Sequence, residues 1–214
     1  MPETVPLFPL DVVLFPGRPL PLHIFEPRYR TLVADVTATN GGRSFGIVAV
    51  GTGRAPVAEI GTIAEILSRQ PYPDGRSDLL TVGSRRFRIE SLDPDSRPYL
   101  QGEVEWLEEV DGDVAAETLQ TATRLMDMYA ALLSRLAGNQ PEEFLPKDAL
   151  RASYEIAGRL HLGLAERQGL LAAGSAAERL TMEIALLRRE LRLVAATRTV
   201  PVSASALRVT PGAN

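Results

Sequence analysis

The chain has 214 residues, 45% of them hydrophobic and 23% charged, and its 23 basic and 27 acidic residues give a formal net charge of −4. It contains no cysteine, which excludes disulfides and thiolate chemistry and favours a reducing compartment. The first basic residue is Arg18, so the start lacks the charged region of a signal peptide, and no apolar run approaches the roughly 20 residues that span a membrane. We therefore expect a cytoplasmic protein without a membrane partner.

The N-terminal half has the pattern of short strands. Up to about residue 107, runs rich in Val, Ile and Phe alternate with Gly and Pro, which is typical of strands joined by turns. One such turn is Pro73-Asp74-Gly75, which combines a proline-set φ, an Asx acceptor and a glycine that can take a positive φ. This pattern predicts a small antiparallel barrel or sandwich. The expected strands cover residues 5–8, 12–15, 20–25, 45–50, 57–67, 79–82, 86–92 and 100–107.

One helix is expected to interrupt these strands. Pro27 suits the first helical position because its missing N–H would be unpaired there in any case, and Glu26 complements the helix dipole. Apolar residues then recur at helical spacing, and Asn40-Gly41-Gly42 is expected to end the helix. The apolar stripe consists of Tyr29, Leu32, Val33 and Val36.

From Val114 onward the apolar residues recur every three or four positions, which predicts helices. Gly138-Asn139 is expected to end the first helix. At the start of the last helix, Ser175 and Glu178 have the spacing of a capping box, in which hydroxyl and carboxylate accept reciprocal backbone N–H groups. Two further helices are expected over residues 148–162 and 164–173.

Together these patterns predict an α+β protein. We expect residues 1–112 to form the β-barrel subdomain with its one inserted helix, and residues 113–197 to form a helical bundle subdomain. Residues 198–214 are rich in Ser, Ala and Pro and have no periodicity, so they are expected to be a flexible tail.

Residues that common active sites require are scarce. The single lysine, Lys147, precedes Asp148, whereas a nucleotide-binding P-loop needs Lys directly before Ser or Thr. Lys147 also lies in a proline-flanked polar stretch, which does not suit the buried lysine of a Ser–Lys site. His23 and His161 cannot form a zinc site without further ligands. We therefore expect no catalytic residues, no cofactor and no metal.

Three other features have ordinary structural interpretations. Gly51-Thr52-Gly53 lacks the third glycine and the helix of a dinucleotide-binding loop, so a hairpin turn is expected. His23 lies in a proline-bounded strand, where a histidine is commonly a hydrogen-bonded structural residue. Trp106 is expected either in the core or at an interface.

The densest basic cluster is Arg85-Arg86-Phe87-Arg88. Its guanidinium groups could bind a phosphate or a carboxylate. On a strand, however, Phe87 would face one side and Arg86 and Arg88 the other, which favours a solvated sheet face. The net acidity of the chain argues against a DNA or RNA footprint.

Several segments form a recognisable series along the chain. They are Pro6-Leu7-Phe8-Pro9-Leu10, Val13-Leu14-Phe15-Pro16-Gly17, Pro21-Leu22-His23-Ile24-Phe25-Glu26-Pro27-Arg28-Tyr29, Phe45-Gly46, Gly61-Thr62-Ile63-Ala64-Glu65-Ile66, Arg85-Arg86-Phe87-Arg88, Glu166-Arg167-Gln168 and Ala177-Glu178-Arg179-Leu180. In sequence and order these segments resemble the N-terminal, substrate-binding domain of the Lon protease family. The resemblance extends over roughly residues 4–196 and implies a barrel related to the PUA fold, followed by a helical bundle without catalytic residues. Because the chain ends where the ATPase of Lon would begin, we expect a free-standing member of this family.

The resemblance implies a non-catalytic protein that binds unfolded or extended polypeptide, as an adaptor or holdase, with a protease or another protein as a further partner. The expected site is a groove between barrel and bundle. An RNA-binding module anchored on residues 85–88 is the alternative from another class, and an enzyme that uses His23 and Glu26 is a third. The residues expected to bind substrate are Phe25, Tyr29 and Phe87 for apolar contact, and Glu26, Arg28 and Arg86 for polar contact.

Overall fold

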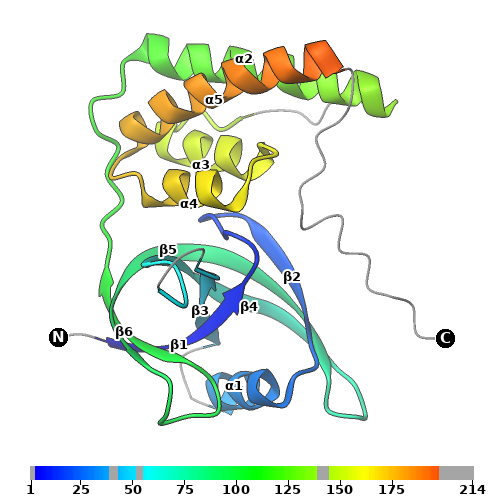
Figure 1. The fold of residues 1–214 in the computed structure, drawn as a ribbon, viewed down its shortest axis with the longest axis vertical. Helices are drawn as coiled ribbons and strands as arrows, with labels where there is room; N and C mark the ends of the chain where they lie inside the picture. Colours follow the sequence, from blue (N-terminus) through cyan, green and yellow to red (C-terminus); the bar gives the residue numbers. More distant parts are fainter. Residues whose placement is uncertain (1–2, 39–42, 52–54, 139–144, 198–214) are drawn as a thin grey trace. The chain divides into compact units, whose positions relative to one another are not determined.

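The structure is a computed structural model that describes residues 3–38, 43–51, 55–138 and 145–197. It divides into two compact units, Met1–Glu108 and Glu109–Asn214, and Figure 1 labels their elements. The expected tail over residues 198–214 and the expected helix end at residues 40–42 lie outside the described residues. The first unit contains β1 (Glu3–Leu10), β2 (Pro19–Ile24), α1 (Pro27–Ala38), β3 (Ser44–Ala49), β4 (Ile60–Pro71), β5 (Ser77–Asp93) and β6 (Gln101–Trp106).

The six strands form one sheet in the order β2-β5-β4-β3-β1-β6, and β6 also pairs with β5. This last pairing closes a ring of five strands, with β2 added to the outside on β5. The α+β class is confirmed. One detail of the expected antiparallel barrel is wrong, because β1 and β3 are parallel. Parallel neighbours need a long crossover, and here the chain passes through β2 and α1 between them.

One expected strand is absent from the described residues. Residues 12–15 lie outside every strand, although Val13, Leu14 and Phe15 are buried. The segment runs across the sheet: the Thr62 hydroxyl donates to the Leu14 carbonyl at 2.7 Å, and a Cβ on Gly83 would lie 2.3 Å from the Phe15 oxygen. Its apolar side chains are therefore buried by packing against strands rather than by strand pairing.

A second correction concerns β5, which is one strand of 17 residues where the sequence pattern predicts two. The sequence pattern is interrupted near Gly83, and at this point one of the strands paired with β5 is replaced by another. Before it β5 pairs with β2, and after it with β6. Gly83 keeps the backbone bonded across this point by donating to the Arg18 carbonyl at 3.0 Å. The pattern of apolar residues along β5 changes at Gly83 because different side chains are buried before and after this point.

The remaining strand predictions are confirmed, with shifted ends. Val57, expected as the start of a strand, forms only an isolated bridge with Val50, and β4 begins at Ile60. The hairpin expected near residue 51 is supported by the Gly51 N–H, which donates to the Pro56 carbonyl at 2.9 Å. Residues 52–54 lie outside the described part of the chain.

The barrel unit has two apolar clusters. In the first, α1 packs the expected stripe of Tyr29, Leu32, Val33 and Val36 onto the sheet, and the ring of Tyr29 stacks on Phe8 with centroids 3.9 Å apart. In the second, fully buried Phe87 lies among apolar residues of β1, β3, β4 and β6. A Cβ on Gly61 would lie 2.5 Å from the Phe87 ring, so this glycine is needed to admit the ring.

The second unit is helical, as expected. Gly138 ends the first helix with φ 73°, and its N–H donates to the Ser134 carbonyl. At the last helix the Ser175 hydroxyl accepts from the Glu178 N–H at 3.2 Å, but the Glu178 carboxylate accepts from Gly174, one residue earlier than a capping box requires. The helices are α2 (Ala116–Ala137), α3 (Ala149–Arg159), α4 (Leu164–Ala172) and α5 (Ala176–Thr197).

The helical unit buries two charged side chains on α5. Arg179 is fully buried, and its guanidinium donates to the Leu170 carbonyl, the Ser153 hydroxyl and the Tyr154 hydroxyl at 2.9–3.1 Å. Glu183, one turn along, is also fully buried, and neither carboxyl oxygen has a hydrogen-bond partner among the described residues. Burial raises the pKa of Glu183 well above its usual value, although the nearby charge of Arg179 opposes this shift.

No helix in the described part of the chain is both long and apolar enough to cross a bilayer.

Candidate polypeptide-binding surface

Among the described residues of the first unit, four large apolar side chains are exposed. Phe25 follows β2 directly, Tyr72 lies in the turn between β4 and β5, Leu80 lies on β5, and Leu67 lies on β4. Their exposed fractions are 59% for Phe25, 38% for Tyr72, 41% for Leu80 and 59% for Leu67. We call the surface formed by His23, Phe25, Tyr72 and Leu80 the aromatic corner.

Strand register brings His23 and Leu80 onto the outer face. His23 on β2 lies opposite Asp78 on β5, and Pro21 lies opposite Leu80. Side chains alternate between the two faces of a strand, and on β5 the neighbours of Leu80, Leu79 and Thr81, are buried. Leu80 is therefore directed outward by the register that buries Leu79.

The rings of the corner contact one another. Phe25 stacks on His23 with centroids 6.0 Å apart, and His23 meets the edge of Tyr72 at 6.2 Å. Asp78 joins the last two, because one carboxylate oxygen lies 2.5 Å from the His23 Nδ1 and the other accepts from the Tyr72 hydroxyl at 2.5 Å. These contacts hold His23 and Tyr72 in position before any ligand binds.

The same hydrogen bonds set the charge of the corner. The bond to Asp78 raises the pKa of the Tyr72 phenol, and the bond from Tyr72, followed by that from His23, lowers the pKa of Asp78. A hydrogen bond to an ionised carboxylate stabilises that form and disfavours ionisation of the donor. At neutral pH Tyr72 is therefore a neutral phenol beside an ionised Asp78.

Two arginines near the corner form ion pairs. In the turn, Arg76 pairs with Asp74 at 2.6 Å and lies over the Tyr72 ring at 5.8 Å from its centroid. After β2, Arg28 pairs with Glu26 at 2.8 Å. A third arginine, Arg30, places its guanidinium beside Gly75 of the same turn.

The structure separates the six predicted substrate-binding residues. Phe25 is exposed at the corner, and Glu26 and Arg28 follow it as an ion pair. Tyr29 and Phe87 are buried, each in a different core cluster. Direct apolar contact with a substrate is therefore wrong for Tyr29 and Phe87 in this conformation, because their rings are enclosed by the barrel.

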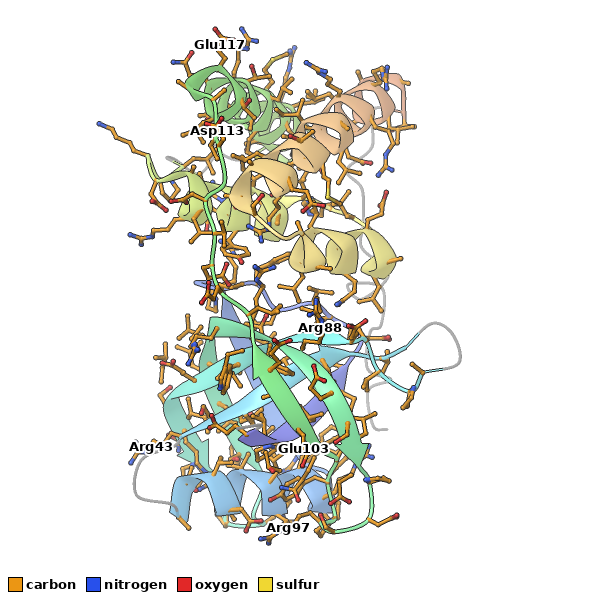
Figure 2. The ribbon with its side chains drawn as sticks, turned by 90° about the vertical axis from the view of Figure 1, so that its left-hand side faces the viewer. Arg43, Arg88, Arg97, Glu103, Asp113 and Glu117 are labelled. Atoms are coloured by element: carbon orange, nitrogen blue, oxygen red, sulfur yellow. The ribbon has the colours of Figure 1, made fainter. Side chains whose placement is uncertain are left out.

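The arginine-rich strand is not an open basic patch. Arg86, expected on a solvated face, is 2% exposed, so that expectation is wrong. Arg85 is exposed and lies over the Trp106 ring at 4.5 Å. Arg88, labelled in Figure 2, forms ion pairs with Glu59 at 2.9 Å and Glu105 at 3.4 Å. These contacts leave little unpaired positive charge for a phosphate.

Two other residues singled out in the sequence have structural partners. His23 bonds Asp78, as a hydrogen-bonded structural histidine should. Trp106 is half-buried, meets the edge of Phe87 at 6.5 Å and donates from its indole to Glu3 at 3.0 Å. Within the described residues, no group of three or more His, Asp or Glu side chains could hold a metal ion.

Sequence reasoning missed Tyr72 and Leu80. Adjacent Leu79 and Leu80 both suit a buried strand, and only the register shows which one faces outward. Tyr72 had a usable signal, since an aromatic residue beside a Pro-Asp-Gly turn is commonly exposed with that turn. The groove expected between barrel and bundle stays a prediction.

Comparisons with known proteins identify the family. The family model of the "ATP-dependent protease La (LON) substrate-binding domain" matches residues 4–189. The Lon protease of Cytophaga hutchinsonii is 25% identical, over 93% of this chain and 26% of that protein. The Lon protease of Escherichia coli K12 is 28% identical, over 89% of this chain and 25% of that protein. The chain thus spans about a quarter of the length of the curated relatives it matches.

Solved structures agree with this assignment. A Lon N-terminal domain protein from Xanthomonas campestris superposes with a TM-score of 0.66 at 31% identity, covering 86% of this chain and 98% of that one. The N-terminal domain of the Mycobacterium avium complex Lon protease shares the fold, with a TM-score of 0.63 and 18% identity. The match covers 87% of this chain and 98% of that one. The matched model describes the substrate-binding part of the protease rather than its catalytic parts, and the chain belongs to the Lon substrate-binding domain family.

Proposed function

We propose that the chain binds unfolded or extended polypeptide, without catalysis, through the aromatic corner. The observation that carries the proposal is that Phe25, Tyr72 and Leu80, three of the four exposed large apolar side chains among the described residues of the barrel unit, lie on this one surface. Contiguous exposed apolar area on a protein surface is a mark of an interaction site. Membership of a substrate-binding family supports the same function.

The chemistry of the corner suits substrates of varied sequence. The rings of His23 and Tyr72 are already held by Asp78, so little side-chain freedom is lost when an apolar segment packs on them. Since the neighbouring Arg28 and Arg76 are paired, the corner selects for apolar content rather than for charge.

Side-chain contact supports this proposal better than strand addition. In the described residues β2 pairs only with β5 and is the outer strand of the sheet, which would make it the strand to extend. Pro19 and Pro21, however, have no N–H to donate. Prolines at an edge strand prevent pairing with another chain.

The residues on which the RNA-binding alternative depends do not form an open basic surface. The alternative relied on residues 85–88, where Arg86 is buried and Arg88 is paired with two carboxylates. Single-stranded RNA binding also requires a positive groove beside the stacking rings, and two arginines near the rings of the corner, Arg28 and Arg76, are paired with acids.

The test measures fluorescence anisotropy of labelled, reduced and carboxymethylated α-lactalbumin titrated with the full chain. The double variant Phe25→Ala/Leu80→Ala should bind roughly tenfold more weakly, since truncating a central apolar contact commonly costs more than about 1 kcal/mol. Met128→Ala, which removes a similarly exposed apolar side chain of the helical unit, should bind as the unaltered chain does.

Equal affinity of the double variant and the unaltered chain would contradict the proposal. Labelled single-stranded RNA, titrated at two salt concentrations, tests the alternative, because phosphate binding weakens steeply with salt. A holdase should suppress aggregation of a heated client by itself. An adaptor should instead accelerate degradation of that client only when its protease is added.

A further inference from the structure

Of the two ring nitrogens of His23, the protein holds one and leaves the other without a partner. One carboxylate oxygen of Asp78 lies 2.5 Å from Nδ1 of His23, and the other accepts from the Tyr72 hydroxyl at 2.5 Å. The bond from Tyr72, followed by that from His23, lowers the pKa of Asp78. At neutral pH this group is therefore a carboxylate, which can only accept, so Nδ1 of His23 carries the proton of the bond.

This contact fixes the tautomer of His23. With its proton on Nδ1, the neutral ring leaves Nε2 as a hydrogen-bond acceptor. The side chain of His23 is 46% exposed, and none of the described residues bonds Nε2. Histidine is the side chain whose charge ordinarily changes between about pH 5 and 8. When His23 takes up a second proton, that proton therefore binds at Nε2.

Protonation at Nε2 adds a charge and breaks none of the contacts that hold the ring. The bond from Nδ1 to Asp78 then joins opposite charges, which strengthens it. Phe25 stacks on the His23 ring with centroids 6.0 Å apart, and the edge of Tyr72 lies at 6.2 Å. A cation over an aromatic face is attracted to it, so the corner keeps its arrangement when His23 becomes charged.

The charged groups around His23 balance one another while its ring is neutral. On β4, Gln70 lies opposite Asp78 and is uncharged, and the Tyr72 phenol is neutral because the bond to Asp78 raises its pKa. The turn and the segment after β2 supply equal numbers of acids and arginines, so protonation of His23 makes the corner positive. These groups are Glu26, Asp74 and Asp78, with Arg28, Arg30 and Arg76.

From this geometry we propose that protonation of His23 gives the aromatic corner a preference for acidic polypeptide segments. The Nε2–H of the charged ring donates to an Asp or Glu carboxylate of the bound segment, while Phe25 and Leu80 contact its apolar side chains. In the neutral ring Nε2 can only accept, so a carboxylate gains no hydrogen bond there. The inference rests on the proposed function, because it concerns what the same surface binds.

The second histidine of the chain provides a matched control. His161 belongs to the helical unit, where its Nδ1 lies 3.3 Å from the Tyr129 hydroxyl. Burial, followed by the charge of Arg167, lowers the pKa of His161. Since the chain contains two histidines, replacing each in turn shows which one is responsible for a change of binding in the histidine range of pH.

The test uses a labelled peptide of Leu, Asp, Ser and Gly, kept extended by its glycines, and a twin in which every Asp is Asn. Anisotropy is measured at about pH 8 and about pH 5.8, on either side of the ordinary pKa of histidine and well above that of Asp. The full chain should bind the two peptides within about twofold of each other at the higher pH. At the lower pH it should bind the acidic peptide roughly threefold more tightly or better.

The ratio of the two affinities is the readout, because loss of the His23 ring also removes an apolar contact that both peptides use. His23→Gln should bring the ratio at the lower pH back to within about twofold of unity. His161→Gln should keep the ratio of the unaltered chain. Because His23 is exposed at the surface, His23→Gln should melt within about 2 °C of the unaltered chain.

The outcomes separate this inference from the proposed function. Binding of both peptides with a ratio that does not change with pH would overturn the inference and leave the proposed function standing. A pH-dependent ratio that persists in His23→Gln, or that disappears in His161→Gln, would assign the effect to another group and overturn the inference as well. Absence of binding by either peptide at both pH values would overturn both.

Discussion

The barrel and the helical unit differ in how their exposed large apolar side chains are arranged. At the aromatic corner, Phe25 and Tyr72 both contact the ring of His23. In the helical unit, Met128 and Leu136 lie eight positions apart on α2, and Leu193 lies on another helix, α5. Apolar side chains that contact one another form a surface on which a partner can pack, whereas singly exposed ones are ordinary on protein surfaces.

The two units also differ in how far these side chains are organised before binding. Asp78 fixes His23 and Tyr72 through two hydrogen bonds of 2.5 Å, whereas an exposed Met side chain such as that of Met128 has several rotatable bonds and loses more freedom when a partner immobilises it. The corner is therefore suited to contact with segments that have no structure of their own.

The largest expected effect is the loss of stability when a core ring of the barrel unit is removed. Phe87→Ala removes the ring enclosed by the second core cluster and should destabilise the chain by about 3–5 kcal/mol, the usual cost of a large-to-small change in a core. Urea unfolding measures it. Phe25→Ala, at an exposed position, should change stability by less than about 0.5 kcal/mol. A similar loss for both would show that Phe25 supports the fold.

Glu183→Gln tests the buried charge of the helical unit. The folded pKa is raised, so the folded state holds a proton that the unfolded state releases, and stability falls as pH rises from the unfolded pKa through the folded one. The variant lacks this loss and should gain about 1–3 kcal/mol over the unaltered chain at alkaline pH. Melting followed from acidic to alkaline pH measures this difference, and a difference that does not grow with pH would contradict the assignment.

Salt should have the smallest effect. Raising salt from about 50 mM to about 200 mM shortens the screening length, but apolar contact does not depend on charge. Binding of unfolded α-lactalbumin at the aromatic corner should therefore change less than about twofold. Anisotropy at both concentrations measures this change, and a loss of about tenfold or more would show that charge rather than apolar contact carries the binding.

Much of the fold follows from local patterns. The α1 stripe, the glycine that ends α2 and the polar N-terminus of α5 are all visible in the sequence, because apolar spacing and cap chemistry are set by residues within a few positions of one another. The parallel pairing of β1 with β3 is not visible there, since it joins segments separated by β2 and α1.

The site was predicted less well than the fold. Phe25, Tyr29 and Phe87 were all expected to make apolar contact with substrate, and of these three the structure exposes Phe25 and buries the other two. Alternation along a strand tells which residues share a face and does not tell which face is covered. Arg86 shows the same limit, because it lies on the expected polar side of β5 and is nevertheless buried.

Composition and motifs alone excluded a P-loop and thiol chemistry, and the Pro-Leu-His-Ile-Phe-Glu-Pro-Arg-Tyr segment pointed to the family. These conclusions depend on which residues are present and on their short-range order. The aromatic corner depends instead on the register between β2 and β5, which directs Leu80 outward and places His23 opposite Asp78. Register results from burying one face of the whole sheet at once, so only the tertiary structure decides it.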